Sequence, residues 1–380
     1  MIYRKFGKLD WETSILGFGA MRLPLLDDNR ANVDEQQSID MIRYSVDHGV
    51  NYVDTAYFYH DGMSEKIVGR ALADGYRQKV KLATKLPSWL IQKPQDFNRY
   101  LAEQLERLQT DEIDFYLLHG LTRHFWSKLQ KMDVFQWAEK KLAEGVIHHL
   151  GFSFHDQFEV FQEIVDAYDK WTFCQIQYNY MDTEFQAGTK GLQYAADRGL
   201  AVVVMEPLRG GQLTRKPPEK VAELWGEALQ ERSQAEWALN WVWDQPGVTM
   251  ALSGMSEMQH VVENVAIAER YNERGLNTED LALIGEISEA YRDLNPIPCT
   301  SCRYCMPCPN GVDIPKCLEL YNDAYKYSDP QTPRFVYRWQ AKELQGGNCS
   351  QCLECEEKCP QDIPIAEWLE KVHAYLGEKD

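Results

Sequence analysis

The cysteines of this chain are gathered near its C-terminal end, at spacings that suit metal binding. Nine of the ten lie between Cys299 and Cys359, and Cys174 is the only one in the first 298 residues. The first run, with two residues between neighbours, is Cys299, Cys302, Cys305 and Cys308. The second run, with three residues between its last two members, is Cys349, Cys352, Cys355 and Cys359. Clustered cysteines in a cytosolic chain favour metal over disulfides.

The second run resembles the bacterial ferredoxin pattern for [4Fe–4S] clusters, in which the fourth cysteine serves the other cluster. Three thiolates in steps of three residues can wrap three corners of a cubane from one loop. The resemblance implies two clusters, one held by Cys299, Cys302, Cys305 and Cys359 and the other by Cys349, Cys352, Cys355 and Cys308. The first run departs from the pattern, because it has one residue fewer before its last cysteine. Zinc is the main alternative, although structural zinc sites usually pair two close cysteines with a distant second pair.

The segment between the two cysteine runs indicates which type of ferredoxin module the chain resembles. Cys317 lies there, outside both runs, and we interpret it and Cys174 as packed thiols. About forty residues separate the runs, with helical character over 314–325 and 334–344. A compact ferredoxin has a shorter spacer, so residues 298–369 are similar to the α-helical ferredoxin modules found within larger redox enzymes.

A second group of reactive side chains stands at or just after the ends of predicted strands. It consists of Asp54, Tyr59, Lys85 and His119. A carboxylate beside Lys85 would keep the lysine charged, and the ammonium would lower the pKa of the Tyr59 phenol. The phenol could then protonate a carbonyl oxygen that His119 orients. The pattern therefore predicts a proton-donating site.

The sequence Asp54-Thr-Ala-x-x-Tyr59, followed by Lys85 and His119, resembles the catalytic tetrad of the aldo-keto reductase superfamily. The resemblance runs over about residues 3–268. It implies a (β/α)8 barrel, a nicotinamide cofactor and reversible reduction of a small-molecule aldehyde or ketone, with Tyr59 as proton donor. Tyr57 competes for that role, but the spacing from Asp54 favours Tyr59.

The same resemblance implies a set of cofactor contacts. Ser153 and Gln177 correspond to the pair that holds the nicotinamide carboxamide, and Met205 replaces an aromatic residue that often stacks on the ring. The full implied set is Met21, Arg22, Asp54, Ser153, Gln177, Met205, Pro207, Leu208, Gly210, Gly254, Ser256, His260 and Asn264. Gly254 and His260 stand where many members have the Lys and Arg that grip a 2′-phosphate, so NADP and NAD both stay open. Flavin is a further alternative, because barrels bind flavin phosphate without an obvious signature.

Eight strands and their helices must position these side chains. Short β-branched runs at 15–20, 52–56, 81–85, 113–119, 149–154, 173–179, 201–206 and 249–254 predict the strands. Helical periodicity is present at 34–48, 64–73, 94–108, 126–143, 157–168, 189–198, 233–243 and 257–270. Glycines after several of these helices, such as Gly49, Gly145 and Gly199, suit left-handed C-caps.

Eight strand–helix units favour a (β/α)8 TIM barrel over an open doubly wound sheet. We therefore expect an α/β barrel domain over residues 1–295 and a small, mostly α-helical ferredoxin-like domain over 296–380. The expected boundary follows a helix at 278–294, which the two prolines at 296 and 298 stop. In such a barrel, chemistry belongs to the carboxyl ends of the strands.

The composition limits the classes of partner that we expect this chain to bind. A net charge of −18 excludes nucleic acid as an expected partner, because phosphate binding needs a basic surface. No secretory signal and no apolar stretch of about 18 residues is evident, so we expect a cytoplasmic protein without a membrane partner. The expected partners are a small carbonyl substrate and, as a candidate, a redox protein.

Two functional hypotheses follow. In the first, the chain is an oxidoreductase for nicotinamide-dependent carbonyl reduction, coupled to or stabilised by two clusters. In the alternative, the clusters carry electrons to a partner or bound flavin, and the barrel is only a docking scaffold.

Overall fold

The computed structural model describes residues 1–27, 29–273, 275–299 and 301–377. The chain forms two compact units. The barrel unit comprises Met1–Gly211 and Arg232–Asn277, and the C-terminal unit comprises Gln212–Glu231 and Thr278–Asp380. By packing, the helix at 278–293 therefore belongs with the C-terminal unit, and the boundary that we expected after residue 295 stays a prediction.

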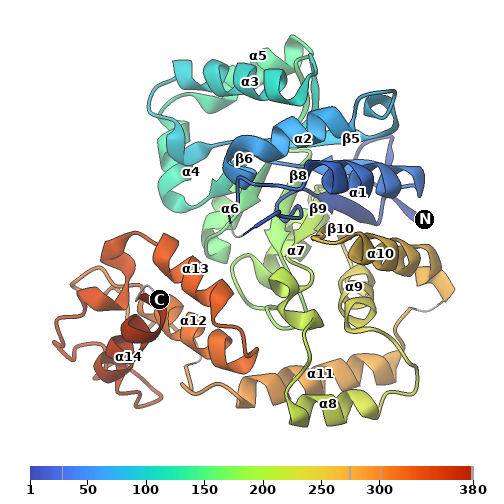
Figure 1. Cartoon of the computed structure of the whole chain (residues 1–380). Coiled ribbons are helices and arrows are strands. Elements are labelled where there is room, and N and C mark those ends of the chain that lie inside the picture. The colour runs from blue at the N-terminus through green and yellow to red at the C-terminus, as the bar shows by residue number, and fades with distance from the viewer. Residues whose placement is uncertain (28, 274, 300, 378–380) are drawn as a thin grey trace. The chain divides into compact units, whose positions relative to one another are not determined.

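The core of the barrel unit is a closed sheet of eight parallel strands (Figure 1). All eight strands that the sequence predicts are present. They are β3 (Leu16–Gly19), β4 (Tyr52–Asp54), β5 (Lys81–Leu86), β6 (Ile113–Leu121), β7 (Ile147–Phe154), β8 (Phe173–Gln177), β9 (Ala201–Met205) and β10 (Val248–Gly254). Each pairs with the next in sequence, and β10 closes the barrel against β3. The fold is thus the predicted TIM barrel.

Helices surround the strands at the predicted places. They are α1 (Glu35–Asp47), α2 (Met63–Ala71), α3 (Gln95–Leu108), α4 (Arg123–Gln130), α5 (Val134–Ala143), α6 (Phe158–Asp166), α7 (Gly188–Asp197), α9 (Gln234–Asp244) and α10 (Met258–Arg270). The single helix predicted at 126–143 was wrong, because the chain breaks it between α4 and α5. Asp133 has a left-handed backbone there, with φ of 54°, which Asp tolerates better than most residues. Gly49, Gly145 and Gly199 do adopt the predicted left-handed conformation.

A short hairpin that the sequence did not predict closes the amino end of the barrel. It consists of β1 (Tyr3–Lys5) and β2 (Glu12–Ser14). Between these strands, the Phe6 ring packs 4.7 Å from that of Phe115 and 5.6 Å from that of Phe173, both near the start of their strands. Because aromatic rings fill this end, the reactive side chains of the barrel are expected at the carboxyl ends of the strands.

The C-terminal unit is mostly helical. Its helices are α8 (Glu219–Gly226), α11 (Thr278–Asp293), α12 (Ile314–Lys326), α13 (Gln331–Trp339) and α14 (Ile365–Gly377). The helix predicted at 334–344 ends earlier, at Trp339, and a separate 3-10 turn spans Lys342–Leu344. Cys317 is buried in the unit's apolar core, and Cys174 is buried in β8, as predicted for packed thiols. Within the described residues, no helix has the length and apolar character needed to span a bilayer.

Candidate active site and cysteine loops

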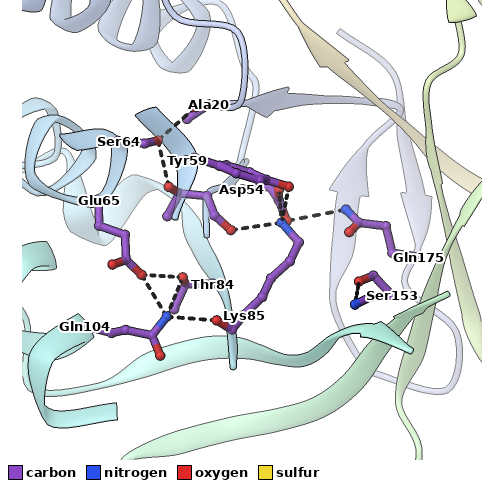
Figure 2. Close-up of polar contacts among 12 residues, drawn as sticks. Ala20, Asp54, Tyr59, Ser64, Glu65, Thr84, Lys85, Gln104, Ser153 and Gln175 are labelled. Atoms are coloured by element: carbon purple, nitrogen blue, oxygen red, sulfur yellow. Dashed lines mark hydrogen bonds and ion pairs between the residues drawn. The ribbon is translucent and has the colours of Figure 1, made fainter. Parts of the chain in front are cut away.

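The structure brings three of the four predicted catalytic residues into direct contact (Figure 2). Asp54 ends β4, Lys85 lies near the end of β5, and Tyr59 begins the 3-10 turn Tyr59–Gly62. Lys85 Nζ donates to Asp54 Oδ1 at 2.5 Å and to the Thr55 carbonyl at 2.9 Å, and it lies 3.3 Å from Tyr59 Oη. Lys85 and Asp54 are fully buried, so the lysine can act only on groups inside this site.

The fourth predicted residue, His119 of β6, lies close to Tyr59 and is surrounded by aromatic rings. Its ring centroid lies 6.0 Å from Tyr59, 5.0 Å from Trp89 and 5.6 Å from Phe58. The imidazole is buried, and its Nδ1 has no hydrogen-bond partner among the described residues. Trp89 and Phe58 are only half-buried, so part of each ring is open to solvent beside His119.

Burial is the largest single influence on the pKa of each of these side chains, although it does not always decide the direction of the shift. It raises the pKa of Tyr59, and the lowering effect of Lys85 is smaller. Burial by itself would lower the pKa of Lys85, but Asp54 and Tyr59 outweigh it and raise that pKa. The pKa of His119 falls well below its ordinary value, first through burial and then through Lys85. At neutral pH the site therefore holds a charged lysine, a protonated phenol and a neutral imidazole. This corrects the expectation of a net lowered pKa for Tyr59.

Tyr57, the competing proton donor, is engaged elsewhere. Its hydroxyl donates to Glu103 Oε2 at 2.5 Å, and the Arg107 guanidinium lies 4.0 Å from its ring centre. The geometry therefore favours Tyr59, as the spacing predicts.

The two residues predicted to hold a nicotinamide carboxamide, Ser153 and Gln177, are on neighbouring strands but are not paired with each other. Ser153 of β7 pairs in register with Gln175 of β8, and Gln175 Nε2 lies 3.4 Å from Asp54 Oδ2 (Figure 2). Gln177 instead donates to Asp182 Oδ2 at 3.1 Å. Gln175 was not among the predicted contacts, although it lies beside Asp54 and Lys85.

Other predicted cofactor residues converge from three strand ends. Arg22 follows β3, and its side chain extends along Gly254 at the end of β10 to Gly210 after β9. A Cβ atom on Gly210 would lie 2.7 Å from Arg22 Nη2, and one on Gly254 would lie 3.3 Å from Arg22 Cδ. Gly210 also has a φ of 66°, which favours glycine. These glycines form a cradle after the seventh and eighth barrel strands, where TIM barrels commonly bind phosphate.

The remaining predicted contacts surround this cradle or support it. Asn264 is buried and donates to Ser253 Oγ at 3.1 Å, so it joins α10 to β10. Pro207 is buried, Met205 and Leu208 are half-buried, and Met21, Ser256 and His260 are exposed. All of these residues lie at the carboxyl ends of β3, β9 and β10 or in α10.

The loop of the first cysteine run and the last cysteine of the second run border one cavity. Its lining includes Cys299, Cys302, Cys305 and Cys359 together with Pro315, Leu318, Pro360, Ile363 and Ile365. No three of the described cysteine, histidine or acidic side chains converge on one point as the ligands of a single ion would, and these four thiols instead border the walls. The donor set and the apolar walls fit a [4Fe–4S] cubane.

The two cysteine loops share one backbone pattern. The second and fourth residues after each first cysteine are left-handed: Ser301 and Arg303 in one loop, and Gln351 and Leu353 in the other. In the second loop the Gln351 amide donates to Cys349 Sγ at 3.4 Å. Asn310, two residues after Cys308, donates to Ser350 Oγ at 2.6 Å, so the chain that follows Cys308 contacts the second loop.

His60 binds the loop after β3, which carries the predicted cofactor residues Met21 and Arg22. Its Nε2 accepts from the Leu23 amide at 3.0 Å, which leaves Nδ1 to donate to the Arg30 carbonyl at 2.9 Å. Burial lowers the pKa of His60. At acidic pH the unfolded chain therefore binds a proton at His60 that the folded chain does not bind. Because proton binding favours the unfolded state, the free energy of unfolding falls as the pH drops below about 6.5.

We predict that His60→Gln weakens this acid sensitivity. The loss of unfolding free energy between pH 8 and pH 5.5, measured with urea, should shrink by about 1 kcal/mol. His48→Gln is the control, because His48 is exposed at the C-terminal end of α1. An unchanged acid dependence in His60→Gln would contradict the neutral assignment.

An eight-stranded parallel barrel with an Asp–Tyr–Lys–His site, joined to a helical unit with two cysteine loops, defines an oxidoreductase with a ferredoxin-type region. Residues 15–289 match the model of the aldo/keto reductase family, and residues 298–364 match that of the 4Fe-4S dicluster domain. The chain belongs to the aldo/keto reductase family, and it is an oxidoreductase enzyme.

Known relatives match the barrel part of the chain. Aldo-keto reductase AKR11C1 from Bacillus halodurans, in its holo form, is 27% identical with a TM-score of 0.63, covering 76% of this chain and 96% of its own. An aldo/keto reductase from Klebsiella pneumoniae, solved with NADP and acetate, is 27% identical with a TM-score of 0.61, covering 75% and 95%. The NADH-specific methylglyoxal reductase of Escherichia coli is 27% identical over 75% of this chain and 97% of its own length.

Proposed function

We propose that the barrel reduces an aldehyde or ketone with a nicotinamide cofactor, and that Tyr59 is the proton donor. The observation that carries this proposal is the contact of Tyr59 Oη with the buried Lys85 ammonium, which Asp54 holds at 2.5 Å. The Klebsiella relative binds NADP and the Escherichia relative is NADH-specific, and these names support a nicotinamide without choosing between its two forms.

The side chains divide the work as follows. When bound, the nicotinamide supplies hydride to the carbonyl carbon. Neutral His119 orients the carbonyl oxygen, and the Tyr59 hydroxyl gives that oxygen its proton. The Lys85 ammonium stabilises the phenolate that remains, and Asp54 compensates the buried charge. The product is an alcohol, and the phenol regains its proton from solvent.

We further propose that Gln175, rather than Gln177, acts with Ser153 on the carboxamide. Gln175 pairs with Ser153 across β7 and β8 and reaches Asp54, whereas Asp182 already engages the Gln177 amide. The cofactor's phosphates would then bind over the cradle of Arg22, Gly210 and Gly254.

The C-terminal unit, in this proposal, holds two [4Fe–4S] clusters with the crossed ligand sets that the sequence predicts. The cavity bordered by the first loop and Cys359 supports one set, and the hydrogen bond between Asn310 and Ser350 supports the place of Cys308 in the other. A cluster carries one electron at a time and a hydride carries two, so direct exchange between them is unfavourable.

An oxygen-free titration with NADPH and then NADH tests the cofactor. We expect nicotinamide fluorescence to change on binding to the holoprotein, and a small aldehyde such as methylglyoxal to be consumed with one equivalent of the nucleotide. Visible absorbance of the clusters in the same cuvette, with a check for released flavin, shows whether the barrel and clusters exchange electrons. Absence of both binding and aldehyde consumption would contradict the proposal.

A further inference from the structure

A polar network lies behind Lys85, between α2, α3 and β5 (Figure 2). At its centre is Glu65 of α2, whose side chain has no exposed surface. Its Oε1 accepts from Thr84 Oγ1 at 2.7 Å and from Gln104 Nε2 at 2.8 Å, and its Oε2 accepts from Arg107 Nη1 at 3.2 Å. A buried carboxylate is costly unless donors surround it, and here three donors do.

This network reaches the backbone beside two catalytic residues. Gln104 Nε2 also lies 3.0 Å from the carbonyl oxygen of Lys85. Arg107 Nη1 donates to the Tyr57 carbonyl at 2.9 Å, on the loop that leads to Tyr59. Glu65 therefore binds both Gln104, which contacts the strand of Lys85, and Arg107, which contacts the loop of Tyr59.

The neighbouring Ser64 fixes the third catalytic strand. Its hydroxyl donates to the Ala20 carbonyl at 2.8 Å and lies 2.8 Å from Thr55 Oγ1. The Thr55 carbonyl is itself an acceptor for Lys85 Nζ. The first turn of α2 thus connects the ends of β3, β4 and β5.

We propose that Glu65, acting through Gln104 and Arg107, is a positioning residue that sets the separation of Lys85 and Tyr59. The inference rests on the proposed carbonyl reduction. Glu65 touches none of the reacting groups. Its effect arises because the two anchored backbones determine how closely the ammonium approaches the phenol.

Glu65→Gln tests this role, because an amide cannot accept from three donors and brings its own N–H groups toward Arg107. We expect kcat for carbonyl reduction to fall about tenfold, since small misplacements of catalytic groups have effects of this size. The Kd of the nicotinamide should stay within about twofold, because the cradle is on other strands. A weaker Lys85 contact also means that the pKa of Tyr59 rises, so the alkaline bend of the pH profile should move up by about one pH unit.

Asp114→Asn is the matched control. Asp114 is a buried carboxylate near the amino end of β6, where it accepts from the Leu82 amide at 2.9 Å and from Lys81 Nζ at 2.8 Å, both at the amino end of β5. We expect it to lower Tm without moving the bend or reducing kcat more than about twofold.

The inference is overturned if Glu65→Gln behaves like Asp114→Asn, with a lower Tm but an unchanged bend. If the wild-type protein reduces no carbonyl, it is the proposed function that fails. The ultraviolet titration of Tyr59, taken as the difference between each protein and its Tyr59→Phe counterpart, then still decides the inference. An unchanged Tyr59 titration in Glu65→Gln overturns it.

Discussion

Tyr59→Phe should abolish nearly all carbonyl reduction, with a loss of about 10²- to 10⁴-fold in kcat. The substitution removes only the hydroxyl that lies 3.3 Å from Lys85 Nζ, and the ring can keep its edge-to-face contacts with Phe58 and His119. Nicotinamide affinity should change little. Aldehyde consumption and cofactor oxidation, followed together under anaerobic conditions, provide the measurement.

Tyr57→Phe is the matched control, because it removes a neighbouring hydroxyl that bonds Glu103 instead of Lys85. We expect it to keep most of the activity. Equal activity of the Tyr59 and Tyr57 variants would contradict the assignment of the proton donor. If the wild-type chain passes electrons to an acceptor dye but reduces no carbonyl, and Tyr59→Phe passes them equally well, the electron-transfer alternative is correct.

Paired cysteine variants should lose iron in a pattern that reveals the ligand sets. The holoprotein should hold about eight irons, because each of two cubanes contains four. In the crossed arrangement Cys302 and Cys359 serve the same cluster, so Cys302→Ala with Cys359→Ala should leave about four irons. Cys302 and Cys308 serve different clusters, so Cys302→Ala with Cys308→Ala should damage both and leave far fewer than four.

The reverse pattern would show that each run holds its own cluster. Cys317→Ala is the control, because this thiol is buried outside both runs, where burial raises its pKa to about 12. Iron, zinc and acid-labile sulfide are measured together on anaerobically purified protein. Zinc at one or two equivalents with no sulfide would contradict the proposal of clusters altogether.

The local sequence was sufficient for the order of the barrel elements and for naming the side chains that the fold brings into contact. Alternating and helical periodicities come from short-range backbone geometry, so eight strands and most helices were predicted within a few residues. Asp54, Lys85 and His119 follow from the rule that barrel chemistry lies at strand ends. The cysteine spacing predicted iron–sulfur loops because three thiolates in steps of three residues can hold three corners of one cluster.

Some site residues carry a signal that is visible only in hindsight. Gln104 interrupts the apolar stripe of α3 between Leu101 and Leu108, and Glu65 stands on the buried side of α2. A polar residue on a buried helix face is expected to meet a buried partner. The sequence does not name that partner, because Glu65 lies in α2, whereas Thr84 lies in β5 and Gln104 and Arg107 lie in α3.

Only the tertiary structure shows that Gln175 and Gln177 have different partners. The two are separated by one residue in the same strand, so the period of two places both on one face and local pattern cannot choose. The register of β8 against β7 sets Gln175 beside Ser153, and the turn after β8 gives Gln177 to Asp182. Packing also placed residues 212–231 with the C-terminal helices, and closed the barrel with Phe6. These outcomes depend on contacts between segments that are distant in the sequence. The periodicity of the sequence indicates only the local backbone conformation of each segment.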